Sequence, residues 1–355
     1  MIEIDGSHGE GGGQILRTAI SLSAVTMEPV RVVNIRAGRP TPGLKNQHLA
    51  GIEVTGKLVN AEINGLRVGS TRIEFIPKER RGGRISYDIG TAGAISLVLQ
   101  AVLIPAVLAP EPTYIEITGG TDVLWSPPID YMKHVFDFML QKMGPKIGIT
   151  QHRRGHYPRG GGKVSCSVEP VDRIHGIDFV EFGQVERIRG ISHCAKLPAH
   201  VAHRQADAAE SYLRKKGLED INIERKYWSK QEDPHLGAGS GVVIWAESDR
   251  GLRMGGDSLG KKGKPAEKVG REAARQLSNE LATGRAVDSH LCDILVPYMA
   301  IAEGENRIGV TEVTSHLETN IWVVEKMLDI ETKLEGEHGQ PGKLTIKGTG
   351  VSPSN

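Results

Sequence analysis

Apolar and polar residues follow one another along this 355-residue chain in an order that occurs three times. Each copy reads strand, helix, strand, helix, strand, strand, as judged from period-two alternation and from apolar residues at helical spacing. The first copy spans about residues 1–78, the second about 84–171 and the third about 185–344. Internal repetition of this kind predicts a scaffold of three βαβαββ units.

The individual elements follow from the local periodicity. Alternating or β-branched runs predict strands at residues 2–4, 30–35, 61–68, 71–76, 85–89, 114–117, 147–152, 163–168, 307–313, 330–335 and 343–347. Apolar residues three or four positions apart, such as Ile15, Leu16, Ala19 and Leu22, predict helices. These helices cover residues 14–25, 47–58, 94–108, 128–143, 291–303 and 318–328.

An additional stretch, about residues 198–283, separates the first strand of the third copy from its first helix. Within it we expect helices at 201–216 and 266–282 and strands at 221–227 and 241–247. Because the chain is longer than one core usually supports, two domains are expected. The predicted class is α/β (α+β). Residues 1–184 and 284–347 form a large repeat domain, 185–283 a small inserted αβ domain that starts with the first strand of the third copy, and 348–355 a tail.

Composition limits the class of protein only modestly. Hydrophobic residues make up 39% of the chain and charged residues 25%, with a formal net charge of +1. Near-neutrality does not exclude an RNA ligand, because local clustering of charge decides such binding. The three cysteines lack paired metal-ligand spacing, which favours a reduced, cytoplasmic protein. We see no signal peptide and no apolar run approaching the roughly 20 residues that span a bilayer.

A glycine-rich turn, Asp5-Gly6-Ser7-His8-Gly9-Glu10-Gly11-Gly12-Gly13-Gln14, leads into the first helix. Glycines allow a tight turn that presents N–H groups, and a helix N-terminus favours an anion. Arg17 would add a positive charge one turn into the helix, and Glu10 could bind a divalent cation. A purely structural strand-to-helix turn explains the same residues equally well.

Arg36 and Arg39 follow the second strand, shortly before Lys45 and Gln47 at the next predicted helix start. Guanidinium groups beside a helix N-terminus favour phosphate binding. We prefer this interpretation to two solvated surface arginines, because Arg17 belongs to an adjacent element of the same repeat.

A basic loop, Arg153-Arg154-Gly155-His156-Tyr157-Pro158-Arg159-Gly160-Gly161-Gly162-Lys163, joins the last two strands of the second copy. Its charges could meet a nucleic-acid backbone. The alternative is a plain β-hairpin turn.

His316 lies at the start of the second helix of the third copy. A helix N-terminus disfavours an imidazolium and attracts phosphate, so a neutral ring could attack the α-phosphorus of a bound triphosphate. A polar helix cap is the commoner fate of such a histidine. Asp293, on an otherwise apolar helix, could orient His316 or bind a ribose, or it could simply favour the helix start.

These motifs together resemble the RNA 3′-terminal phosphate cyclase family, in its archaeal type. The resemblance rests on the Arg154–Val164 segment with its triple glycine, the Gly9–Arg17 run, the Arg36–Arg39 segment and the residues around His316. It covers nearly the whole chain. It implies three βαβαββ units, each like the C-terminal domain of a bacterial translation initiation factor, and an insert of thioredoxin-like topology.

The resemblance also implies roles for individual residues. His316 would become adenylylated, and Glu10 would bind Mg²⁺ or Mn²⁺. The residues around the phosphates would be Arg17, Arg36, Arg39 and Gln47. The nucleotide pocket would be lined by Gln100, Pro127, His290, Leu291, Cys292, Asp293 and Ile294. Some relatives place a tyrosine where this chain has His290, which offers less stacking area.

The implied reaction uses ATP to convert an RNA 3′-terminal phosphate into a 2′,3′-cyclic phosphate through a histidine–AMP adduct and an RNA-adenylate. The implied partners are ATP and the RNA 3′-phosphate end, without a membrane, and a homo-oligomer is conceivable. The main alternative is a non-catalytic cyclase-like protein acting in ribosomal RNA processing. His316 and the arginines argue against that role. Further alternatives are an enolpyruvyl transferase, whose motifs we do not find, and an RNA-binding scaffold whose basic loops do no chemistry.

Overall fold

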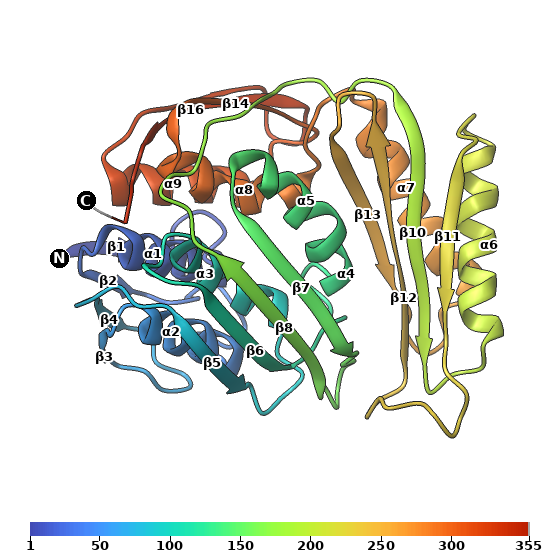
Figure 1. Cartoon of the computed structure of the whole chain (residues 1–355), viewed down its shortest axis with the longest axis horizontal. Coiled ribbons are helices and arrows are strands. Elements are labelled where there is room, and N and C mark those ends of the chain that lie inside the picture. Colours follow the sequence, from blue (N-terminus) through green and yellow to red (C-terminus); the bar gives the residue numbers. More distant parts are fainter. Residues whose placement is uncertain (354–355) are drawn as a thin grey trace.

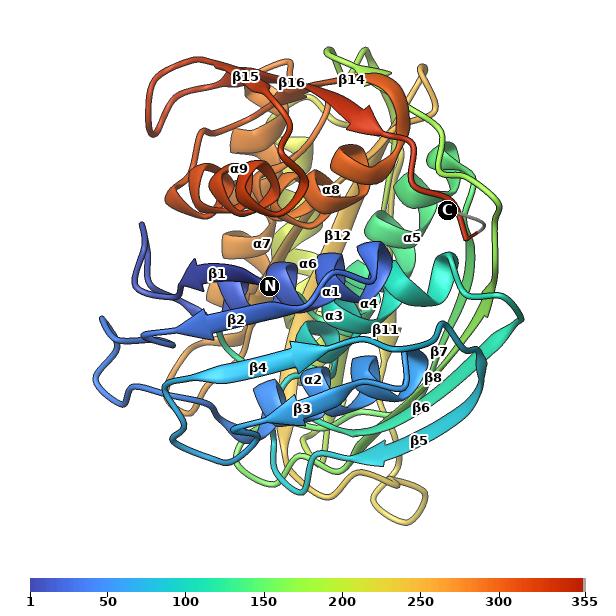
Figure 2. The same cartoon turned by 90° about the vertical axis from the view of Figure 1, so that its left-hand side faces the viewer.

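A computed structural model describes residues 1–353 as four four-stranded mixed sheets with helices packed against them. Three sheets enclose a central group of helices, and the fourth lies at one end of the molecule (Figures 1 and 2). This arrangement confirms the α+β class. The division into two domains with the boundaries given above stays a prediction.

The first sheet has the strand order β1-β2-β4-β3, in which β1 and β2 are parallel and the other pairs antiparallel. Val30 and Val32 are buried while their neighbours are half-buried, so alternation places one face of β2 against the helices. The elements are β1 (Ile2–Asp5), α1 (Gly13–Thr26), β2 (Val30–Val33), α2 (Asn46–Leu58), β3 (Glu62–Asn64) and β4 (Ile73–Ile76).

The second sheet has the equivalent order, β5-β6-β8-β7. Its elements are β5 (Gly83–Asp88), α3 (Ile95–Val107), β6 (Thr113–Gly119), α4 (Ile129–Tyr131), α5 (Asp137–Leu140), β7 (Lys146–Arg153) and β8 (Gly162–Glu169). The helix predicted at 128–143 is not uniform, because a π-helical turn at Met132–Phe136 separates α4 from α5 and a 3₁₀ turn follows at Gln141–Met143.

The third sheet, β9-β14-β16-β15, repeats this order once more. Its elements are β9 (Asp178–Phe179), α8 (Ser289–Ile301), β14 (Glu303–Val310), α9 (Ser315–Leu328), β15 (Thr332–Glu335) and β16 (Gly342–Thr349). The predicted start of the third copy at Val185 is wrong. The strand parallel to β14 is the two-residue β9, whose brevity leaves no periodic signal in the sequence.

The fourth sheet, β11-β10-β12-β13, contains the strand that begins at Val185. Its elements are β10 (Val185–Ala195), α6 (His200–Arg214), β11 (Ile221–Lys226), β12 (Gly239–Ser248), β13 (Arg253–Leu259) and α7 (Ala266–Ala282). The helix predicted at 266–282 is confirmed, whereas β13 was not predicted. Helices α6 and α7 pack on each other and on this sheet, and β13 also meets the π-helical turn of the second unit.

Helices α1, α2, α3, α8 and α9 contact one another in the centre of the three enclosing sheets. The pair α1 and α9 is decisive for the site, because it joins the first and third units side by side. Strand β16 continues to Thr349, beyond the predicted limit at 347, and the N–H groups of Gly350 and Val351 donate to carbonyls at the end of α8. None of the described helices is long and apolar enough to cross a membrane.

Candidate functional site

Helix α9 carries His316 at its second position. Thr314 is the N-cap, since its Oγ1 accepts a hydrogen bond of 3.0 Å from the N–H of Leu317. The alternative that His316 is itself the cap is therefore wrong. The His316 side chain is free to reach out of the helix and is 47% exposed.

Two side chains of the glycine-rich turn hold the ring of His316. Its Nδ1 lies 2.5 Å from Oε1 of Gln14 and 2.6 Å from Oε2 of Glu10. The Gln14 contact has hydrogen-bond geometry, and the Glu10 contact is an ion-pair distance only. The turn of the first unit thus fixes a histidine of the third unit, more than 300 residues later.

Both oxygens of Glu10 face a partner. Its Oε1 pairs with the guanidinium of Arg39, and its Oε2 is buried 2.6 Å from Nδ1 of His316. Burial opposes ionisation, but the contacts with His316 and Arg39 prevail and lower the pKa of Glu10. An anionic carboxylate beside the partly exposed His316 fits the binding of a hard cation.

The glycines of this turn are required by close approach. Gly9 has φ +53° and Gly11 has φ +58°, which is left-handed backbone that glycine adopts without strain. A Cβ on Gly9 would lie 2.5 Å from Oγ1 of Thr319, on α9. Any side chain there would therefore push the turn away from the helix that bears His316.

Arg17, on α1, has a hydrogen-bond donor without a partner. Its Nε is buried and has no hydrogen-bond partner in the described part of the chain. Burial lowers the pKa of Arg17 to about 10, although Asp293 and Glu10 favour the charged form. The group therefore stays cationic at neutral pH, and a bound anion would satisfy it.

His48 is buried beside Gly13 of the same turn and was missed by sequence reasoning. Its Nδ1 accepts a 3.0 Å hydrogen bond from the N–H of Lys45, and its Nε2 would lie 2.5 Å from a Cβ on Gly13. Burial lowers the pKa of His48 to about 3, and the positive charges of Arg17, Arg36 and Lys45 act in the same direction. The ring is neutral and its Nε2 must carry the proton, because Nδ1 is an acceptor. A histidine at the third position of a helix was the available signal.

Arg36 and Gln47 are engaged in structural contacts. Arg36 Nη1 donates to the carbonyls of Thr41 and Gly43, at 2.8 and 2.9 Å, which closes the loop after β2. Gln47 Oε1 accepts a 3.1 Å hydrogen bond from the N–H of Ala94, the N-cap residue of α3. Both residues therefore shape the neighbouring loops, and their expected phosphate contacts stay a prediction.

The residues expected around the nucleotide lie in three places. Gln100 is half-buried on α3 and Pro127 is half-buried before α4. On α8, the side chains of Leu291, Cys292 and Ile294 are buried in the core, at 0%, 1% and 6% exposure. A ligand could meet Leu291 and Cys292 only through their backbone, and the expected nucleotide contacts of this segment stay a prediction.

Asp288, not Asp293, starts α8. Its Oδ1 accepts from the N–H of Leu291 at 2.9 Å and from Tyr131 Oη at 2.6 Å, and its Oδ2 accepts from the N–H of Gly255 at 2.9 Å. One buried carboxylate thus joins α4, α8 and β13. The interpretation of Asp293 as a helix-start carboxylate is therefore wrong.

Asp293 lies one turn further along α8, and its side chain faces Thr314 at the start of α9. Thr314 Oγ1 is 3.4 Å from its Oδ1, and Asn320 Nδ2 donates to its backbone carbonyl at 2.6 Å. Burial raises the pKa of Asp293 to about 7, although His316 and His290 oppose the rise. This carboxyl is therefore poised between its charged and neutral forms near neutral pH.

The raised pKa of Asp293 has a consequence for stability. The folded value of about 7 lies above the usual 3.8, so the folded chain binds more protons between these pH values. The stabilisation is present at acid pH and is lost as the pH rises through 7. We expect Asp293→Asn to raise the free energy of unfolding at pH 8 by on the order of 1 kcal/mol, a figure reduced for partial exposure.

Urea titrations at pH 5 and pH 8 would measure this effect of Asp293→Asn on the free energy of unfolding. The exposed Asp172→Asn should leave the difference between the two pH values unchanged, and an equal response of both variants would contradict the assignment.

His290 lies where α8 faces the fourth sheet. Its side chain is 46% exposed. Its Nε2 is 3.4 Å from Nε2 of Gln276 on α7 and 3.9 Å from Oδ1 of Asp257 on β13. Burial opposes the charge, but Asp257 and further carboxylates raise the pKa of His290. The fourth sheet therefore forms one wall beside the residues expected at the nucleotide.

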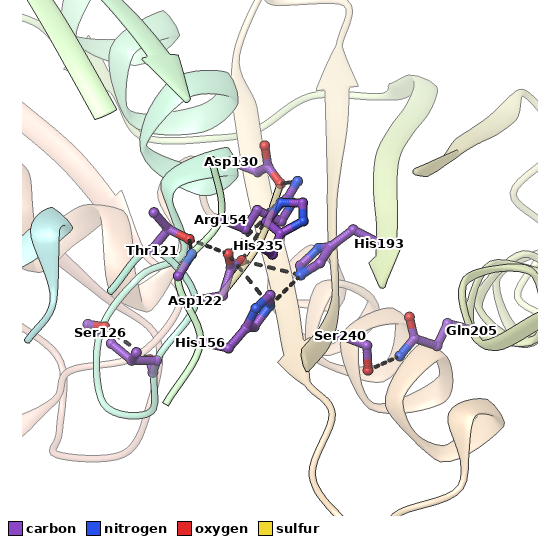
Figure 3. Close-up of polar contacts among 12 residues, drawn as sticks. Thr121, Asp122, Ser126, Asp130, Arg154, His156, His193, Gln205, His235 and Ser240 are labelled. Atoms are coloured by element: carbon purple, nitrogen blue, oxygen red, sulfur yellow. Dashed lines mark hydrogen bonds and ion pairs between the residues drawn. The ribbon is translucent and has the colours of Figure 1, made fainter. Parts of the chain in front are cut away.

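The basic loop at 153–163 does not present all its charges to solvent. Arg154 is 4% exposed and binds Asp122 and Asp130 with distances of 3.1 and 2.6 Å (Figure 3). His156 is buried beside it, whereas Tyr157 is 79% exposed. Arg154 is therefore not available to nucleic acid, because its guanidinium neutralises buried carboxylates, and contact through the other basic residues of the loop stays a prediction.

The chain is similar to known proteins over nearly its whole length. Residues 8–334 match the model of a family described as RNA 3′-terminal phosphate cyclase. A protein of that name from Methanopyrus kandleri is 51% identical over 350 residues, covering 99% of both chains. Proteins of the same name from Thermococcus kodakarensis and Pyrococcus abyssi are 52% and 51% identical, covering 97–98% of both chains.

The fold and the site thus define an α+β protein with a histidine held at the meeting point of two repeat units. The chain belongs to the RNA 3′-terminal phosphate cyclase family.

Proposed function

We propose that the protein is an ATP-dependent RNA 3′-terminal phosphate cyclase that works through a covalent His316–AMP adduct. The observation that carries this proposal is the position of the His316 ring. Because Gln14 and Glu10 both offer oxygens to Nδ1, that nitrogen carries the ring proton. The lone pair is then on Nε2, and a side chain that is 47% exposed is open to a substrate from solution.

The first step transfers AMP to the protein. Nε2 of His316 attacks the α-phosphorus of ATP, a nitrogen–phosphorus bond forms, and the bond to the bridging oxygen of pyrophosphate breaks. Glu10 and Gln14 orient the ring and stabilise the positive charge that develops on the imidazole. Pyrophosphate leaves with the electron pair.

Two further steps use the adduct. A terminal oxygen of the RNA 3′-phosphate attacks the phosphorus of the adduct, so AMP passes to the RNA and His316 is released. The adjacent 2′-hydroxyl then attacks the RNA phosphorus, loses its proton, and expels AMP to leave a 2′,3′-cyclic phosphate. This last step needs little assistance, because the nucleophile is already held next to its target.

The phosphates of ATP would lie over the start of α1. That helix begins after Gly12 without a side-chain cap, so its first N–H groups are available to an anion. Arg17 and Arg39 approach the same point, and the unpartnered Nε of Arg17 is a donor for a phosphate oxygen. The base and ribose would lie toward Gln100, Pro127 and the His290–Ile294 segment.

Glu10 would hold Mg²⁺ or Mn²⁺ through its carboxylate. Such an ion, when bound, would supply charge neutralisation on the triphosphate. We further propose a cytoplasmic location and regard assembly into a homo-oligomer as a prediction that size-exclusion chromatography with light scattering would test.

The test is labelling with ATP. Incubation with α-labelled ATP and Mg²⁺ or Mn²⁺ should place acid-labile, alkali-stable label on the protein, and peptide mass spectrometry should locate one AMP at His316. Addition of an oligonucleotide with a 3′-phosphate should remove the label and yield a cyclic end. The matched oligonucleotide with a 3′-hydroxyl should do neither. A protein that takes no label would favour the non-catalytic binding role.

A further inference from the structure

A second polar cluster lies away from His316, where the second unit meets the fourth sheet. It consists of Asp122 after β6, His156 in the loop after β7, and His193 in β10 (Figure 3). All three are buried, with exposures of 3%, 5% and 0%. Nothing in the proposed reaction uses them.

The three side chains direct their ligand-type atoms at one point. Nε2 of His156 is 3.2 Å from Nε2 of His193, and these atoms lie 4.0 and 3.6 Å from the two oxygens of Asp122. Bonds of about 2.0–2.1 Å to a tetrahedral zinc ion place neighbouring ligand atoms roughly 3.3 Å apart. The observed spacing is therefore close to that of a metal site before small adjustments.

The protonation of the cluster also suits a cation. Burial lowers the pKa of His156 and the pKa of His193, so both rings are neutral. Burial opposes ionisation of Asp122, but Arg154 prevails and lowers the pKa of that carboxyl. Two neutral imidazoles and one carboxylate are a donor set that divalent transition metals, Zn²⁺ above all, accept.

Without a cation, the same geometry is poorly satisfied. Two neutral Nε2 atoms 3.2 Å apart can share only one proton, so at most one of the two ring nitrogens donates in this contact. A metal ion would satisfy both Nε2 atoms at once.

The surroundings hold the cluster in place. Thr121 Oγ1 donates to Asp122 at 2.6 Å, and Arg154 binds the same carboxylate as well as Asp130. The two carboxylates and one guanidinium leave a net charge of −1 for a cation to offset. Outer contacts of this kind orient metal ligands.

The fourth sheet approaches the cluster closely. A Cβ on Gly239, at the start of β12, would lie 2.1 Å from the ring of His156, so only glycine permits this contact. His235, which is 2% exposed and bound to Asp233 at 2.8 Å, lies beside Arg154 in Figure 3. An ion bound here would link the second unit to the fourth sheet.

We propose that Asp122, His156 and His193 form a structural binding site for one divalent transition-metal ion, with Zn²⁺ as the best match. The ion would fix the fourth sheet, and with it the wall beside His290, against the second unit. This site is separate from the hard-cation site at Glu10, and the proposal does not depend on the proposed reaction.

Metal binding to the full-length protein tests the proposal directly. The protein is stripped with a chelator and titrated with Zn²⁺, and with Co²⁺ as a spectroscopic probe. We expect one tightly bound Zn²⁺ per chain, visible absorption of Co²⁺ in a low-coordinate site, and a higher melting temperature with Zn²⁺. His193→Gln and His156→Gln should each weaken binding by more than about 100-fold, since even outer contacts are worth 10–100-fold.

Two variants serve as controls. Glu10→Gln alters the proposed hard-cation site and should keep full Zn²⁺ binding, as should His338→Gln, whose histidine is exposed. Equal Zn²⁺ affinity in His193→Gln and the unaltered chain would overturn the assignment. So would an unaltered, folded chain that binds neither ion more tightly than about 1 μM. That second result needs no variant and would identify the cluster as a hydrogen-bonded contact only.

Discussion

Replacement of His316 by alanine should abolish formation of the protein–AMP adduct. We expect a loss of at least about 10⁴-fold, the scale reached when a covalent nucleophile is removed, because no other group can accept AMP at this point. The side chain is 47% exposed and Thr314 caps the helix, so the free energy of unfolding should change by less than about 1 kcal/mol. Single-turnover labelling with α-labelled ATP, together with urea denaturation, would measure both quantities.

The matched control is His338→Ala. The side chain of His338 is exposed and pairs with Glu318 at the surface, so this variant should label normally. A His316→Ala protein that labels at the unaltered rate would show that the nucleophile is another residue. A protein that unfolds would instead show that the contacts with Glu10 and Gln14 are structural.

Replacement of Arg154 by alanine should cause the largest loss of stability. Its guanidinium is 4% exposed and neutralises Asp122 and Asp130, so its removal leaves two buried carboxylates without a counter-charge. Breaking a buried ion pair in this way costs about 3–5 kcal/mol. Urea titration at neutral pH would show the decrease in the free energy of unfolding.

Two further variants interpret that result. Arg159→Ala changes an exposed arginine of the same loop and should lower the free energy of unfolding by less than about 0.5 kcal/mol. Arg154→Lys keeps the charge but not the planar fork that reaches both carboxylates, so its loss should be intermediate. Equal stability of Arg154→Ala and Arg159→Ala would contradict the role given to the buried network.

Around the fourth sheet, the sequence predicted the bounds of elements well where these are long and periodic. Helix α7 matches its predicted range, because its apolar residues recur at helical spacing. Strand β13 was missed because the run Arg253–Leu259 contains two adjacent glycines and polar residues, and its pairing with β12 supplies what local propensity does not. The π-helical turn in the 129–143 segment is likewise invisible to periodicity.

Resemblance pointed to His316, Glu10 and Arg17 as one site, and the structure brings these three residues together. The resemblance gives no equivalent signal for His48 or for the cluster of Asp122, His156 and His193. The members of that cluster are separated by 34 and 37 residues and have no metal-ligand spacing. They meet only because the fourth sheet packs against the second unit.

By itself, the sequence determined the α+β class, the strand and helix order within the first two units, and the candidate nucleophile. These properties depend on local periodicity, turn glycines and short motifs, all of which act between residues close in the chain. Only the tertiary structure decided which basic side chains can bind a ligand and which are neutralised within the protein. The Nε of Arg17 has no hydrogen-bond partner among the described residues, whereas Arg154 forms ion pairs with Asp122 and Asp130. Such an outcome depends on burial and on partners from distant segments, and no local pattern encodes either.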